Sequence, residues 1–304
     1  MRFDPISVVI PVRNEGERIR TTIDSILAGR SQPFDIEIVV VDDASDDRSC
    51  TGLERLADGH PDASIVVTRL DRWSGIPFAR NRGAETARHP VLVITDGNTE
   101  FPSGWNAHVW RQLRPGRILC ATIADRDSSF RGYGCQLQLP SMGTTWIANP
   151  GAFGGQVPVA PCTCTVMERS VFLRLGGYDE ALPLYGAAEP EFSLRAWMSG
   201  CEIVQVPELV IRHRFRPRAE FDAYRAAIRP VLQRNYLRFA CCYLPPDWLM
   251  QAYVHHGDGD PAAVTPCVEA LVREGVWQRR AQLSRLPRSF DWFAQRFALC
   301  RAPH

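Results

Sequence analysis

The sequence contains no lysine, so all 35 of its basic side chains are arginines. This absence excludes a lysine Schiff base as a covalent intermediate. The 35 basic residues nearly balance 34 acidic ones, and a net charge of +1 argues against nucleic-acid binding through bulk charge. A chain whose basic residues are all arginine is typical of a GC-rich genome, and we expect a bacterial source.

Long apolar runs and patterned cysteines are also lacking. No apolar stretch reaches the roughly 18–20 residues that span a bilayer, and no secretory signal precedes the first expected strand. The ten cysteines include no Cys-x-x-Cys pair, so we expect reduced thiols and no structural zinc site. We therefore expect a cytoplasmic protein without a transmembrane segment. Contact with a membrane surface and a homodimer both stay open.

Two nucleotide-binding fingerprints are absent as well. No Gly-x-Gly-x-x-Gly follows the first expected strand and no P-loop sequence occurs, which disfavours a dinucleotide oxidoreductase and a P-loop enzyme. The first hundred residues instead alternate between two patterns. Apolar β-branched runs predict strands over 6–12, 36–41, 64–68 and 91–95. Helical spacing predicts helices over 17–28, 49–57 and 78–88. The alternation predicts βαβ units in a Rossmann-like, mostly parallel sheet flanked by helices, an α/β fold.

The pattern continues less regularly beyond residue 100. Strands are expected over 118–123, 163–167 and 202–206, and helices over 105–113, 169–175 and 191–199. The segment 125–161 is rich in Gly, Pro and aromatic residues, which is typical of a binding loop. From residue 218 to 304 the pattern is helical. The arginine-rich stretch 212–238 is interpreted as a solvated helical face rather than an anion-binding patch.

Oxygen-bearing side chains follow the fourth expected strand, in the order Asp96-Gly97-Asn98-Thr99-Glu100. Open α/β sheets bind ligands beyond the carboxyl ends of their strands. Hard cations such as Mg²⁺ or Mn²⁺ take oxygen ligands and bridge phosphates. On its own, this stretch is equally consistent with a metal site and with a polar turn.

Five motifs resemble, in order, those of the inverting family 2 glycosyltransferases, whose fold is GT-A. They are Val9–Glu15, Val40–Asp47, Ala79–Gly83, Asp96–Asn98 and Gly176–Glu180. The stretch Gly176–Arg216 is also similar to polypeptide N-acetylgalactosaminyltransferases. The resemblance implies a GT-A domain over 1–217, with a nucleotide-binding half at 1–100 and an acceptor half at 101–217. The residues 218–304 would be a helical C-terminal extension.

The resemblance also implies roles for residues near the nucleotide and the metal. Pro11, Arg13 and Glu15 would line the nucleotide, and Asp43 would contact the base or Asp42 the ribose. Arg80 would face the nucleotide or its phosphates. Asp96, Asn98 and His213 would hold Mn²⁺ or Mg²⁺. Asp96 would also contact the nucleotide, and Arg216 would touch the diphosphate. Asn98 departs from the family's usual aspartate, and His213 is alternatively a polar strand-end residue.

The catalytic base is expected on the helix that contains Arg195. The family places an aspartate six residues before such an arginine, and that position is Glu189 here, with Glu191 as the alternative. Pro190 favours the first helical turn, where the helix dipole keeps a carboxylate ionised. The retaining N-acetylgalactosaminyltransferases have an amide at this position, so a carboxylate favours inversion. Sugar or acceptor contacts are expected from Trp146, Tyr178, Tyr185 and Glu191.

The implied function is a metal-dependent, inverting glycosyltransferase of the hexosyltransferase type. It would move a sugar from a nucleoside diphosphate donor, preferably a UDP-sugar, to an acceptor hydroxyl. A retaining glycosyltransferase and a nucleotidyltransferase of related fold stay open. An inactive sugar-nucleotide-binding protein also stays open, because Asn98 departs from the family's aspartate and Ala188 stands where the family has a glutamate next to its catalytic aspartate.

Overall fold

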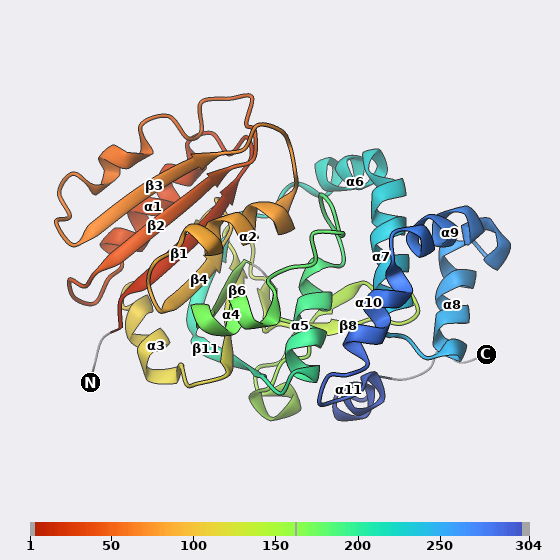
Figure 1. Ribbon diagram of the computed structural model, residues 1–304. Coiled ribbons are helices and arrows are strands. Elements are labelled where there is room, and N and C mark those ends of the chain that lie inside the picture. Colours follow the sequence, from red (N-terminus) through yellow and green to blue (C-terminus); the bar gives the residue numbers. More distant parts are fainter. Residues whose placement is uncertain (1–3, 162, 300–304) are drawn as a thin grey trace.

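The computed structural model describes residues 4–161 and 163–299 and shows an α/β fold with a curled central sheet (Figure 1). Its first half alternates strands and helices in chain order. The elements are β1 (Ile6–Val12), α1 (Arg18–Ala28), β2 (Ile36–Asp42), η1 (Leu53–Ala57), β3 (Ala63–Arg69), α2 (Ile76–Thr86) and β4 (Val91–Thr95). The order in the sheet is β3-β2-β1-β4, and all of these pairings are parallel.

The expected helix over 49–57 is only a short 3₁₀ helix. Gly52 precedes it with a left-handed φ of 68°, and a right-handed helix cannot continue through this backbone conformation. The Asp47 side chain accepts a hydrogen bond from the backbone N–H of Ser49, which holds the preceding residues in a turn. The helical pattern before Gly52 is therefore overridden by local turn chemistry.

The second half of the sheet mixes strand directions. It adds β10 (Cys164–Glu168), β6 (Arg117–Asp125), β11 (Glu202–His213) and β5 (Thr99–Glu100), with β7 (Arg131–Gly132) paired to β6. Six of the nine strands in this sheet run one way, and β10, β5 and β7 run the other. The segment expected as a loop contains β7, the hairpin β8 (Cys135–Leu137) and β9 (Thr144–Trp146), and η2 (Ala152–Gly155).

Helices cover both faces of the sheet. On one face α1 and α3 (Trp105–Gln112) pack on alternate strand residues such as Val8 and Ile10. On the other face α2, α4 (Arg169–Leu175) and α5 (Ala188–Met198) pack on residues such as Val9. Because successive strand residues point to opposite faces, each buried strand contributes to both cores.

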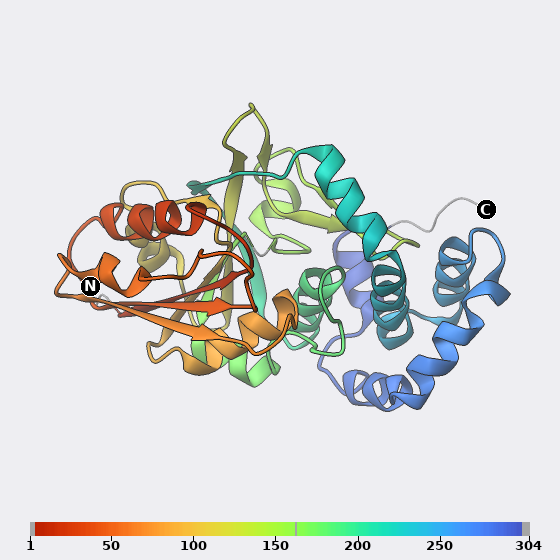
Figure 2. The same ribbon diagram turned by 90° about the horizontal axis from the view of Figure 1, so that it is seen from above.

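The C-terminal helices extend the core on the α5 side. They are α6 (Arg218–Ala227), α7 (Arg229–Tyr243), α8 (Pro246–His256), η3 (Pro261–Val264), α9 (Thr265–Arg273), α10 (Val276–Leu283) and α11 (Phe290–Arg296). Figure 2 shows them on the side of the molecule opposite β3. The Trp197 ring of α5 lies 6.2 Å from Trp292 and 5.1 Å from Phe297, measured between ring centroids. The C-terminal region is helical as expected, and the domain boundary after residue 217 stays a prediction.

The helices and the cysteines also bear on membrane crossing and on disulfide bonds. Within the described part of the chain, no helix is both long and apolar enough to cross a membrane. The cysteines described there are free thiols, and Cys162 and Cys300 lie outside the described residues.

Candidate active site

The predicted site residues gather where the strands of the sheet end. Arg13 follows β1, Asp43 follows β2 and Asp96 follows β4, while His213 is the last residue of β11. Glu189 lies in the first turn of α5. The strands that carry the first four residues run in the same direction, so their carboxyl ends meet at one edge of the sheet.

Arg80 of α2 links two carboxylates of the site. Its Nη1 donates to Oε1 of Glu189 at 3.0 Å, and its Nη2 donates to Oδ1 of Asp96 at 2.8 Å. The guanidinium lies over the ring of Tyr178, 5.6 Å from its centroid, and Arg80 is only 2% exposed. The terminal nitrogens of Arg80 thus bind Asp96 and Glu189, and its expected contact with the nucleotide or its phosphates stays a prediction.

The second carboxylate oxygen of Asp96 faces His213. Oδ2 of Asp96 lies 3.8 Å from Nε2 of His213. This separation is too long for a hydrogen bond. It is shorter than the sum of two metal–ligand bonds, about 4 Å, so a divalent cation can bind both atoms. The Asp96–His213 pair thus fits a metal ion.

The His213 side chain has the properties of a metal ligand. Burial lowers its pKa below 6.5, and the charges of Asp96 and Asp125 oppose this shift. The imidazole is therefore neutral at neutral pH, the form that binds metals. Its Nδ1 is buried and has no hydrogen-bond partner within residues 4–161 and 163–299. The Phe215 ring lies 4.3 Å from the imidazole, measured between centroids, and limits its rotation.

Asn98 lies beside this pair, but its amide nitrogen is occupied. Nδ2 of Asn98 donates to the backbone oxygen of Arg214 at 3.1 Å, which leaves the amide oxygen as the atom that can bind a metal. No group of three His, Cys, Asp or Glu side chains suited to a metal occurs in the portion of the chain that the structure describes. The described residues therefore offer few strong ligands for a cation.

A second cluster forms the side of the site near β1 and β2. Nη1 of Arg13 donates to the backbone oxygens of Asp43, at 2.8 Å, and Ala44. The Arg13 guanidinium also lies 4.9 Å from the ring centroid of Trp73. Trp73 is 41% exposed and was not predicted as a site residue. The sequence signal for it was an aromatic residue two positions before Gly75, in a polar loop that follows an expected strand.

Asp43 organises this loop. Its carboxylate accepts hydrogen bonds from the backbone N–H groups of Ser74, at 2.7 Å, and Gly75, at 2.8 Å. Burial raises the pKa of Asp43, while these two bonds act to lower it. Asp43 thus fixes the segment that leads from Trp73 into α2, a role that the sequence did not predict.

Asp42 does not reach the site. It is 3% exposed, its Oδ1 accepts from the backbone N–H of Ser45 at 2.8 Å, and its Oδ2 is paired with Arg69. The expectation of a ribose contact from Asp42 is wrong for this reason. Pro11 is half-buried in β1, opposite Val41 of β2.

Glu15 and Arg216 lie close enough to interact electrostatically, and Asp96 also acts on Glu15. The Nε of Arg18 donates to Glu15 at 2.8 Å. Burial raises the pKa of Glu15, and Arg216 and Asp96 are close enough to act on it electrostatically. Arg216 itself is exposed, and its guanidinium lies 5.4 Å from the ring centroid of Tyr224 of α6.

Two expected contact residues are buried in the core. Tyr178 is 2% exposed and packs against Phe172 and Phe192, with centroids at 5.7 and 4.9 Å. Because no part of its ring is open to a ligand, the predicted sugar contact from Tyr178 is wrong.

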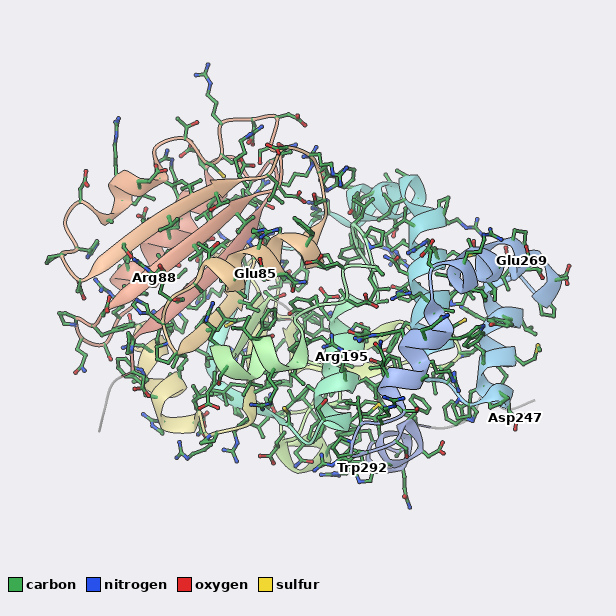
Figure 3. All side chains as sticks on the ribbon, viewed as in Figure 1. Glu85, Arg88, Arg195, Asp247, Glu269 and Trp292 are labelled. Atoms are coloured by element: carbon green, nitrogen blue, oxygen red, sulfur yellow. The ribbon has the colours of Figure 1, made fainter. Side chains whose placement is uncertain are left out.

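Glu191 is likewise buried, at 2% exposure. Its carboxylate accepts two hydrogen bonds from Arg195, at 2.9 and 2.8 Å, and one from the Tyr243 hydroxyl at 2.6 Å. Arg195 lies between the sheet and the C-terminal helices (Figure 3). Glu191 is therefore a structural residue, and neither its alternative role as base nor its acceptor contact fits this structure.

The other two contact residues lie near the site. The Tyr185 ring centroid is 6.0 Å from Tyr224, and burial, with the nearby Glu189, raises the pKa of Tyr185. Trp146 is half-buried and meets Phe215, the neighbour of the His213 ring, at 6.2 Å. Both aromatic residues thus border the Asp96–His213–Glu189 cluster.

Comparison with known proteins places these features in a family. The model of the family "Glycosyl transferase family 2" matches residues 7–176. Polypeptide N-acetylgalactosaminyltransferase 3 of Drosophila melanogaster is 28% identical over 274 residues, 80% of this chain and 39% of its own length. Human polypeptide N-acetylgalactosaminyltransferase 10 is 26% identical over 315 residues, 96% of this chain and 49% of its own. The chain thus spans half or less of the length of these curated relatives.

Solved structures show the same fold. GalNAc-T7 with UDP, GalNAc and Mn²⁺ superposes with a TM-score of 0.74 at 20% identity, over 97% of this chain and 56% of that one. A mannosyltransferase from Pyrobaculum calidifontis in complex with GDP-Man and Mn²⁺ superposes with a TM-score of 0.54 at 18% identity, over 91% and 73%. The GT-A fold is confirmed by these likenesses. The two curated relatives are animal proteins and give no support to a bacterial source, and the cytoplasmic location and homodimer stay predictions.

Proposed function

The chain belongs to glycosyl transferase family 2, and from this premise we propose that it is a metal-dependent glycosyltransferase that acts with inversion. It would move a sugar from a UDP-sugar to an acceptor hydroxyl. The observation that carries the proposal is the buried Arg80, which binds Asp96 on the metal side and Glu189 on the base side. One guanidinium thus fixes the distance between the carboxylate that would bind the metal and the carboxylate that would act as the base.

Asp96 and His213 would hold the cation, together with the amide oxygen of Asn98. A bound Mn²⁺ or Mg²⁺ neutralises the charge that develops on a leaving diphosphate. Mn²⁺ is present in both structural neighbours described above, which supports Mn²⁺ as the ion to test first.

Glu189 would act as the general base. It takes the proton of the acceptor hydroxyl while the hydroxyl oxygen attacks the anomeric carbon. The bond from that carbon to the diphosphate oxygen breaks, and the electron pair leaves with the nucleotide. Arg80 donates a hydrogen bond to the Glu189 carboxylate, which lies in the first turn of α5. Arg80 also offsets the repulsion between Glu189 and Asp96.

The donor would bind across the ends of β1, β2 and β4. Arg13 and the exposed ring of Trp73 offer a flat cationic and aromatic surface for a nucleobase. Arg216 is exposed three residues after the end of β11 and would bind phosphate oxygens. UDP as the donor nucleotide rests on the likeness to GalNAc-T7, whose structure contains UDP.

Retention is the second candidate. It is favoured by the similarity to polypeptide N-acetylgalactosaminyltransferases over most of this chain, since the sequence resemblance associates that family with retention. The anomeric configuration of the product, measured by NMR, separates the two outcomes.

A thermal-shift screen of nucleotide sugars with and without Mn²⁺ tests the proposal. We expect a UDP-sugar to raise the melting temperature only when Mn²⁺ is present. Asp96→Ala should remove this shift, while Glu189→Ala should keep the shift and lose transfer. A shift that is independent of Mn²⁺ in both the wild type and Asp96→Ala would contradict the metal role.

A further inference from the structure

The segment that leads into α5 has an unusual backbone. This pre-α5 loop, Asp179–Ala187, contains Tyr185 and ends just before Glu189. Its φ angles are left-handed at Leu184 (61°), Gly186 (88°) and Ala187 (66°). A non-glycine residue in this region is destabilised by about 1–2 kcal/mol. The loop conformation must therefore be held by contacts from outside the loop.

Helix α7 provides these contacts. The amide nitrogen Nδ2 of Asn235 donates to the backbone oxygens of Pro183, at 2.8 Å, and Tyr185, at 3.0 Å. Asn235 is fully buried, with 0% exposure. One residue earlier, Nη1 of Arg234 donates to the backbone oxygen of Ala181 at 2.8 Å. Consecutive residues of α7 thus bind three carbonyls of one loop.

The same helix limits the loop sterically. A Cβ atom added to Gly186 would lie 2.7 Å from Cδ2 of Leu232, so this part of the loop packs directly on α7. On its other side, the loop contacts the start of α2, where the backbone N–H of Ile76 donates to the oxygen of Leu184 at 3.2 Å. The loop is therefore clamped between α7 and the helix that carries Arg80.

We propose that Asn235 is a positioning residue for the catalytic base. Through its two hydrogen bonds, it fixes the loop that sets the start of α5 and hence the place of Glu189 relative to Arg80. Asparagine suits this position because its NH₂ group donates two hydrogen bonds at once. An aspartate of the same size donates none when ionised and sets an oxygen against two carbonyl oxygens. The link to catalysis rests on the proposed function of Glu189, whereas the hold on the loop does not.

Asn235→Asp tests the inference, with Gln233→Glu as its matched control. Gln233 lies on the same helix, and its amide nitrogen donates to the backbone oxygen of His256 at 2.6 Å, away from the loop. Hydrogen exchange is measured on the peptide 179–191, and kcat and the affinity for UDP with Mn²⁺ are measured alongside. Asn235→Asp should speed exchange in this peptide and lower kcat, each by about ten-fold, at unchanged UDP affinity. Gln233→Glu should match the wild type in hydrogen exchange, in kcat and in the affinity for UDP.

The outcomes are separable. If hydrogen exchange of the peptide 179–191 is the same in Asn235→Asp as in the wild type, the inference is overturned, whatever the value of kcat. Faster exchange with an unchanged kcat in an active enzyme overturns the role in positioning the base. If the wild type transfers no sugar, the proposed function fails, and the exchange result still decides whether Asn235 holds the loop. If Asn235→Asp does not fold, Asn235→Ser is measured in its place, and the same outcomes apply.

Discussion

Replacing Arg80 by methionine tests the arrangement at the centre of the site. Arg80 is 2% exposed and binds Asp96 and Glu189, while its guanidinium covers the Tyr178 ring. Methionine is uncharged and follows the arginine side chain as far as the position of Nε, so it keeps the apolar packing of that part. It removes both charged hydrogen bonds and leaves two carboxylates facing each other without a cation between them.

The expected loss of stability follows from these contacts. A hydrogen bond between charged groups contributes about 1.5–3 kcal/mol, so two contribute about 3–6 kcal/mol. The carboxylate side chains of Asp96 and Glu189 are 26% and 23% exposed, so water replaces part of this interaction. After allowance for solvent screening, we expect Arg80→Met to lower the free energy of unfolding by about 2–4 kcal/mol.

A double-mutant cycle isolates the pair. The free energy of unfolding is measured in urea for the wild type, Arg80→Met, Glu189→Gln and the double variant, since urea adds no salt screening. In the Arg80→Met background, Glu189→Gln removes one uncompensated charge. The free energy of unfolding that the double variant loses should therefore be smaller than the sum of the two single losses, by about 1–2 kcal/mol. Additivity within about 0.5 kcal/mol would refute the reasoning, because the two side chains would then not interact energetically.

Three further predictions concern the metal and the start of α2. Asn98→Asp adds a negative charge beside Asp96 and should tighten Mn²⁺ binding without nucleotide by about ten-fold in calorimetry; equal or weaker binding would exclude this position from the metal site. Burial lowers the pKa of His213 below 6.5, so Mn²⁺ affinity should stay constant from pH 8 to about 6.5 and fall only below it. A decline with its midpoint above pH 6.5 would contradict the neutral, buried imidazole. Gly75 has a φ of 95°, and an added Cβ would lie 2.4 Å from the backbone of Leu184. Gly75→Ala should therefore lower the free energy of unfolding, measured by thermal unfolding, by more than about 1 kcal/mol. The control Gly59→Ala, which meets no atom within 4 Å, should melt close to the wild type, and an equal effect of both changes would refute the clash.

The parallel half of the fold could be predicted because its strands are buried on both faces. Such strands are continuous apolar runs, and Ile6–Val12, Ile36–Asp42 and Val91–Thr95 follow this pattern. The resemblance assigned Arg13, Asp43 and Asp96 to one site, and the parallel order of these strands is consistent with their meeting at one edge of the sheet.

The end of β11 could not be predicted in the same way. A strand was expected over 202–206 and His213 was expected at a strand end, but the sequence did not show that both belong to one strand, β11, which passes an irregularity between Val206 and Val210. Its partner β5 has only two residues, Thr99 and Glu100, and so presents no periodic pattern. The pairing that brings His213 beside Asp96 is therefore set by tertiary contacts rather than by local sequence.

The choice between Glu189 and Glu191 depended on a helix face that the sequence does not reveal. Residues two apart on an α-helix point about 200° apart, so only one of the two carboxylates can face the site. Glu191 points into the core because Arg195 and Tyr243 bind it there. Tyr243 belongs to α7, far along the chain, and no motif near α5 indicates this contact.

The most direct test of the central claim is the reaction of a UDP-sugar with Mn²⁺ and an acceptor, followed by NMR for the wild type and Glu189→Gln. The wild type should form a product whose anomeric configuration is opposite to that of the donor. Glu189→Gln should still bind UDP and Mn²⁺ but react about 10²–10⁴-fold more slowly, the range expected for loss of a general base. Full turnover by Glu189→Gln, or a product with the donor's configuration, would contradict the assignment of Glu189 as the base of an inverting transfer.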